Sequence, residues 1–271
     1  ATTKPVHAFN ILMLGFSFSA AGEIYLFSQL SLNGIYWFFI GSAAVCGVFL
    51  RLLPSKSLNA EELRHQSEIE DQSEDWRVPI AMPILCLIAV CFTYINIGGY
   101  FTYIELAALD EGISPEWVTL LLTWSTFLAF AGCLLAMVCA RFGLFRPLFV
   151  ALLSMAVLVG MLSGGITNIN LAVSMVAFMS LWTFCDVYQS SMMGYMDRSG
   201  SLVALLPSVQ GFGQFVGPNI AASIIGAGLG YSTMFLVSGS MALVGMTIYG
   251  GIFFYMHTRK STQVEAVKEV P

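Results

Sequence analysis

The sequence predicts an all-α protein, a polytopic bundle of eight transmembrane helices. Three observations support this fold class: 57% of the 271 residues are hydrophobic, only 10% are charged, and the mean hydropathy is +0.80. Water-soluble chains average about 25% charged residues. The polar surface that a soluble enzyme, a secreted disulfide scaffold or a nucleic-acid-binding protein needs is therefore missing. We expect the lipid bilayer to be the environment of the chain and nucleic acid not to be a partner.

Eight apolar stretches are long enough to cross a bilayer, for which a helix needs about 20 mainly apolar residues. Helix breakers or charges separate them, as at Pro54 and at Asp110-Glu111-Gly112. Ser114-Pro115-Glu116 is typical of a helix start, because serine caps, proline tolerates the first turn and an acid suits the positive helix end. The expected spans are residues 8–30, 34–53, 78–107, 115–140, 145–164, 167–196, 202–228 and 231–257.

Lysine and arginine indicate which side of the membrane each connection occupies. All eleven bases fall in or beside the five non-membrane segments on one side of the predicted bundle. Basic residues are retained in the cytoplasm, so both ends of the chain are expected on the cytoplasmic face of a cell membrane, the inner or plasma membrane. The predicted organisation is two helices in 1–53, a cytoplasmic loop in 54–77, six helices in 78–257 and a cytoplasmic tail in 258–271.

Cysteine and histidine spacing predicts neither a metal site nor a cofactor. The six cysteines all fall inside apolar runs, without paired spacing or neighbouring histidines, which is typical of buried thiols. The chain has no HExxH or GxSxG motif, and its three histidines lie near span ends or in the long loop. A membrane-embedded enzyme would need such a nucleophile or metal cluster, so we expect that the protein is not an enzyme.

Two motifs resemble those of the major facilitator superfamily of transporters. The glycine-proline helix of that family is similar to Gly211-Phe212-Gly213-Gln214-Phe215-Val216-Gly217-Pro218. The family's basic cytoplasmic loop is similar to Arg141-Phe142-Gly143 followed by Arg146, although Ala140 and Leu144 stand where that loop often has an acid and a base.

This resemblance implies that the eight spans correspond to the fifth to twelfth helices of a family member. The last six would form the C-terminal six-helix domain, and the first two would end the N-terminal domain. The resemblance also implies that four N-terminal helices of the same transporter are missing, and these become an expected partner of the chain. Repeated helix bundles of this kind are a common design of secondary transporters.

Two acids lie where a membrane helix rarely carries a charge. Glu23 falls in the first expected span and Asp186 in the sixth, and no span has a lysine or arginine in its interior. An ionisable residue inside the bilayer generally faces a cavity or a partner. The expected counter-charge is a proton or a cationic substrate; the alternatives are the outer interface for Glu23 and bonding to neighbouring helices for Asp186. Trp182, Asp186 and Gln189 share one helical face.

The third span combines polar residues with paired glycines. Asn96, Tyr100 and Tyr103 fall on one side, where they could bond a substrate, although tyrosines near the interface are also ordinary membrane-belt residues. Gly98 and Gly99 weaken the helix and are expected to permit bending.

The seventh span carries a ridge of small residues, Gly213, Gly217 and Ala221, spaced by four. Such ridges let another helix approach closely, and we expect packing there. Pro218 frees a backbone carbonyl group and could kink the helix.

The expected function is secondary active transport of a small solute by alternating access, with protons exchanged through Glu23 or Asp186, as in a proton-coupled antiporter or other permease. Acidic and aromatic candidate residues favour a neutral or cationic solute. The alternative is a membrane scaffold or sensor that does not transport, which the missing helices would favour. The two are distinguished by whether four more spans precede the chain.

Overall fold

The computed structural model describes residues 30–52, 78–197 and 200–268. All regular secondary structure in these ranges is helical. The chain divides into two units, and one of them, Ser19–Pro79, contains α2 (Leu32–Leu52). This helix matches the expected span 34–53. The loop 54–77 and, apart from its last residue, the span 8–30 lie outside the described residues.

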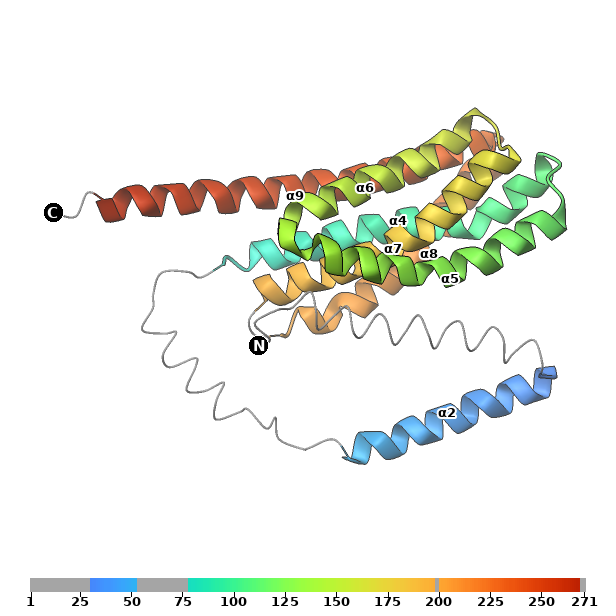
Figure 1. The fold of residues 1–271 in the computed structure, drawn as a ribbon, viewed down its shortest axis with the longest axis horizontal. Coiled ribbons are helices and arrows are strands. Elements are labelled where there is room, and N and C mark those ends of the chain that lie inside the picture. Colours follow the sequence, from blue (N-terminus) through green and yellow to red (C-terminus); the bar gives the residue numbers. More distant parts are fainter. Residues whose placement is uncertain (1–29, 53–77, 198–199, 269–271) are drawn as a thin grey trace. The chain divides into compact units, whose positions relative to one another are not determined.

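The described residues of the second unit form six long helices (Figure 1). Each covers an expected span to within a few residues, except that the last helix continues past residue 257 to Lys268. Short 3₁₀ turns extend three of the helices: η1 (Ala140–Phe142), η2 (Met161–Gly164) and η3 (Val203–Leu205). The long helices are α4 (Ala81–Asp110), α5 (Pro115–Cys139), α6 (Phe145–Gly160), α7 (Asn168–Met196), α8 (Leu206–Gly226) and α9 (Gly230–Lys268).

Local chemistry sets where the helices begin. The hydroxyl group of Ser114 accepts a hydrogen bond from the amide of Trp117 at 3.3 Å, and Pro115 is the first helical residue, so the predicted start of α5 is confirmed. A capping box begins α7, since Thr167 and Asn170 each bond the backbone amide of the other at 3.3 and 2.7 Å. These side chains satisfy amides that the first helical turn leaves without partners.

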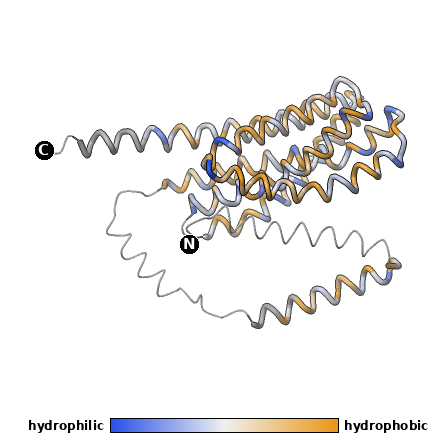
Figure 2. The backbone as a smooth tube through the Cα atoms, viewed as in Figure 1, coloured by the Kyte–Doolittle hydropathy of each residue, from blue (hydrophilic) through white to orange (hydrophobic). Residues whose placement is uncertain are grey.

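Among the residues that the structure describes, five helices are long and apolar enough to cross a membrane: α4, α5 with η1, α6 with η2, α7 and α9. They indicate an integral membrane protein, and Figure 2 shows their hydrophobic residues along the helices with hydrophilic residues mainly at the turns. The prediction of eight spans is not matched in full. The helix α8 is long enough, but Gln210, Gln214 and Asn219 lower its hydropathy.

Helix packing in the six-helix unit repeats after three helices. The main neighbours of α4 are α8 and α9, and those of α7 are α5 and α6. In addition, α4 contacts α7, and α6 contacts α9. Exchanging α4 with α7, α5 with α8 and α6 with α9 therefore reproduces the same main contacts.

Glycines bring α4 and α8 into close contact. A methyl group added at Gly98 would lie 2.8 Å from the carbonyl oxygen of Gln214, and one added at Gly213 would lie 2.7 Å from that of Cys91. Gly217 and Ala221 are buried in α8 as well. The ridge of small residues thus lies against α4, as expected for such a stripe.

The paired glycines of α4 lie at close contacts with two other helices, and bending at them stays a prediction. The helix runs without a break from Ala81 to Asp110. Gly98 faces α8, whereas a methyl group at Gly99 would lie 2.7 Å from the hydroxyl oxygen of Ser238 in α9. The two glycines therefore let two helices approach α4, because neither has a side chain in the way.

Candidate functional site

The membrane acid Asp186 of α7 lies against α4. The hydroxyl group of Tyr94 donates a hydrogen bond to Oδ1 of Asp186 at 2.5 Å. In turn, the indole Nε1–H of Trp182 donates to the Tyr94 hydroxyl oxygen at 3.4 Å. Tyr94 is buried, whereas Asp186 and Trp182 are half-buried. The three side chains form a chain of donors that ends on the carboxyl group.

Three aromatic rings lie together at this site: Tyr94 and Phe101 of α4 and Trp182 of α7. The ring centroids of Trp182 and Tyr94 are 6.4 Å apart, and those of Trp182 and Phe101 are 5.9 Å apart. Both pairs are edge-to-face, an arrangement that aromatic rings favour. Phe101 is 39% exposed, so Trp182 and Phe101 together present an aromatic surface beside a carboxyl group.

Two further hydrogen bonds join α7 to α4 on either side of Asp186. The side-chain amide of Gln189 donates to the hydroxyl oxygen of Thr93 at 2.9 Å. The hydroxyl groups of Tyr100 and Ser174 lie 2.9 Å apart and share a hydrogen bond. Residue numbers rise along α4 as those of their partners fall along α7, so the two helices are antiparallel.

The remaining candidates of α4 differ in accessibility. Asn96 is fully buried, and its Nδ2 donates to the carbonyl oxygen of Ser238 in α9 at 2.7 Å. Its Oδ1 is buried and has no hydrogen-bond partner among the described residues. Tyr100 is 1% exposed and packs on Phe178 with centroids 4.0 Å apart. In this structure neither side chain is open to a solute, whereas Tyr103 is half-buried.

The candidates of α7 lie together, but only part of their face is open. Trp182 and Asp186 keep exposed surface, whereas Gln189 and, one turn further, Met193 are fully buried. The open part of this helical face therefore ends at Asp186, and Gln189 beyond it bonds Thr93 of α4. Glu23, the other acid candidate, lies outside the described residues.

Sequence reasoning missed the partners of these candidates: Tyr94, Thr93, Ser174 and Ser238. One signal was available, since Thr93 lies three residues before Asn96, which places both on one helical face. For Tyr94 we find no such signal. In α4 apolar residues surround the helix, and a helix that is hydrophobic all round does not indicate which face meets a partner.

The basic turn between α5 and α6 contains the predicted loop residues. Gly143 has a φ of 83°, a left-handed conformation that glycine adopts at no steric cost. The guanidinium carbon of Arg141 lies 4.8 Å from the ring centre of Phe142. Arg146 lies in the first turn of α6 and is exposed. Both arginines therefore lie at one end of the six-helix unit.

In the part of the chain that the structure describes, no group of three or more histidine, cysteine or acidic residues is placed to hold a metal ion. Comparisons with models of protein families, with curated proteins and with solved structures find no match to the chain. Function is therefore inferred from the contacts of α4 and α7.

Proposed function

We propose that the chain belongs to a secondary active transporter that moves a small solute by alternating access and couples this movement to protons at Asp186. The observation that carries the proposal is the contact of this acid with Tyr94 inside a bundle of apolar helices. A charged residue at the centre of a bilayer costs about 2.5–3.5 kcal/mol on insertion scales. Because Asp186 lies in α7 despite this cost, it is a candidate for a role in transport.

The partner of Asp186 leaves the carboxyl group able to change its protonation state. A phenol hydroxyl can donate a hydrogen bond to a carboxylate and can accept one from a carboxylic acid. The contact between Tyr94 and Asp186 can thus persist in both states. Trp182 can only donate, so it holds the Tyr94 oxygen from the other side. No expected span has a basic residue in its interior that would hold the acid in its charged form.

The repeated packing supports a transporter of the major facilitator type. In that superfamily each six-helix half contains two three-helix repeats of opposite orientation. The main contacts of α4–α9 repeat after three helices, and α4 is antiparallel to α7. The resemblance of Gly211–Pro218 to the family's glycine-proline helix points the same way. We propose eight spans, with Arg141 and Arg146 and both chain ends on the cytoplasmic side of a cell membrane.

The surroundings of Asp186 favour a neutral or cationic solute. A carboxylate attracts a cation, and the faces of Trp182 and Phe101 can add a cation–π attraction. Both rings lie next to each other and keep exposed surface. An anionic solute would be repelled by the acid in its charged state.

The test uses the protein in proteoliposomes that contain a pH-sensitive dye. A panel of neutral and cationic organic solutes is added, and both proton movement and uptake driven by an imposed pH gradient are recorded. We expect at least one solute to move protons. Asp186→Asn, which keeps the shape and a hydrogen-bond acceptor for Tyr94, should abolish gradient-driven accumulation while solute exchange without a gradient continues.

Glu105→Gln is the matched control, because Glu105 is an exposed acid of α4 and its loss should leave accumulation unchanged. If Asp186→Asn accumulates solute normally, the assignment of the proton site is wrong; Glu23→Gln would then test the other acid. If no solute of the panel moves in any variant or in the parent protein, transport is wrong and the scaffold or sensor alternative gains support.

A further inference from the structure

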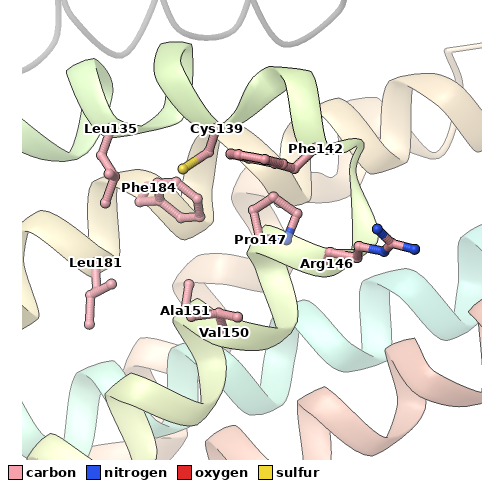
Figure 3. A pocket seen from close by; sticks show the side chains of 9 residues that line it. All are labelled: Leu135, Cys139, Phe142, Arg146, Pro147, Val150, Ala151, Leu181 and Phe184. Atoms are coloured by element: carbon pink, nitrogen blue, oxygen red, sulfur yellow. The ribbon is translucent and has the colours of Figure 1, made fainter.

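A cavity opens at the basic end of the six-helix unit, between α5, α6 and α7 (Figure 3). Its volume is about 340 Å³, within the range of roughly 300–1,000 Å³ that ligand pockets occupy. The Leu135 and Cys139 side chains of α5 lie on one side and Val150 of α6 on the other. The sequence does not predict this cavity, because its lining comes from three helices.

The cavity exists because α5 and α6 both pack on α7 but make little direct contact with each other. Phe184 of α7 and Ala151 of α6 are each 2% exposed and close it on the inside. Leu135 and Val150 are exposed at its rim. The lining is therefore apolar and open at the side of the bundle, where a membrane protein meets acyl chains.

One cation lies at the edge of this apolar lining. Arg146 is exposed, and Figure 3 shows its guanidinium group beyond Pro147, away from Leu181. Among the described residues, no carboxylate forms an ion pair with Arg146. The N-cap residue of α6, Leu144, provides no side-chain hydrogen bond, so amides of the first turn are also left for an anion.

We propose that this cavity binds an anionic membrane lipid, with one acyl chain between α5 and α6 and the acidic headgroup on Arg146. Guanidinium groups bind phosphate with paired hydrogen bonds. Anionic lipids are enriched in the cytoplasmic leaflet, and basic pockets between helices on that side bind acidic headgroups. The apolar lining and the charge at its edge fit the two parts of such a lipid. This site is separate from Asp186, and it does not depend on the transport proposal.

The experiment measures lipid retained by the purified protein. The chain is extracted in a mild detergent and incubated with an equimolar mixture of palmitoyl-oleoyl phosphatidylglycerol and phosphatidylcholine. Native mass spectrometry then counts the bound molecules of each lipid. We expect one phosphatidylglycerol per chain. Arg146→Gln should reduce the preference for phosphatidylglycerol about fivefold, the loss expected for one basic residue at a membrane surface.

Two matched controls separate the cavity from general effects. Arg141→Gln removes the same charge from the same turn, but Arg141 does not line the cavity, so the preference should stay close to that of the parent. Val150→Trp should fill the cavity and abolish retention of both lipids. Val157→Trp places the same bulk two turns along α6 at a residue that is likewise exposed, and it should retain the lipid.

Other outcomes overturn the proposal. Equal retention of both lipids would show that Arg146 does not recognise a headgroup. Equal losses in Val150→Trp and Val157→Trp would show that the lipid does not occupy the cavity. If the parent retains no lipid, another segment of the chain or a second copy covers this surface; a dimer mass that Val150→Trp converts to a monomer would identify the second copy.

Discussion

The glycine contact between α4 and α8 makes a quantitative prediction for Gly217→Ala. A methyl group at residue 217 would overlap the carbonyl oxygen of Ile95 and lie 2.7 Å from the amide nitrogen of Gly99. Both atoms belong to the backbone of α4, so neither can rotate away. The substitution must therefore push the two helices apart, although it adds only one carbon atom.

The magnitude follows from two opposing effects. Extra volume in a well-packed contact typically costs about 1–3 kcal/mol. Alanine in place of glycine inside a helix restores about 0.5–1 kcal/mol, because glycine loses more freedom on folding. Taken at the midpoints of these ranges, the net loss in the free energy of unfolding is about 1.3 kcal/mol. Since about 1 kcal/mol shifts the melting temperature of a domain of 150–250 residues by about 2–4 °C, we expect a decrease of about 3–5 °C.

The assay is thermal unfolding in detergent, followed by helical circular dichroism, for Gly217→Ala and for Gly211→Ala. Gly211 lies in the same helix, but an added methyl group there meets nothing within 4 Å. Gly211→Ala should leave the melting temperature unchanged or raise it slightly. Equal melting temperatures for the two variants would refute the reasoning, because helix propensity alone would then account for both.

Three smaller effects can be measured on the same samples. Thr167→Ala removes the cap of α7 and should lower the free energy of unfolding by about 1 kcal/mol, which is measured as a lower melting temperature. An unchanged melting temperature would mean that the capping box does not stabilise the helix. Tyr100→Phe keeps the ring but removes the hydrogen bond to Ser174. The free energy of unfolding should fall by about 0.6 kcal/mol, which is typical of a hydrogen bond between membrane helices. A small maleimide should modify the half-buried Cys139 faster than the fully buried Cys185, and mass spectrometry of the labelled peptides would detect the opposite order.

Helix positions in the six-helix unit could be predicted from sequence because two local signals mark them. Length and apolar content identify a helix that can cross a bilayer, and caps and glycines mark where it begins and ends. Ser114 and Gly112 illustrate this at the connection of α4 to α5, where Gly112 has a φ of 78°. The number of spans was harder to predict. The glutamines and the asparagine of α8 lower its hydropathy below that of a typical span, although the helix is present.

Close helix contacts could be predicted only where small residues mark them. The stripe of α8 is visible as Gly213, Gly217 and Ala221, four residues apart. A second close contact, at which a methyl group on Gly132 of α5 would overlap the carbonyl oxygen of Ser180 in α7, was missed although small residues also surround Gly132. Spacing shows that a helix can be approached closely. It does not show by which helix, because that depends on the packing of the whole unit.

The contacts on either side of Asp186 determine what its replacement can test. In a bilayer, helices associate through close packing and hydrogen bonds, since lipid chains are as apolar as the helix surfaces. The contact of α4 with α7 keeps the bonds of Gln189 and Tyr100 when Asp186 is changed, and α4 also keeps its glycine contacts with α8. Asp186→Asn should therefore lower the melting temperature by no more than the roughly 0.6 kcal/mol of one such bond. If Asp186→Asn loses gradient-driven transport but keeps its stability, the acid has a role in transport. If the variant loses both, the acid is needed for the stability of the fold.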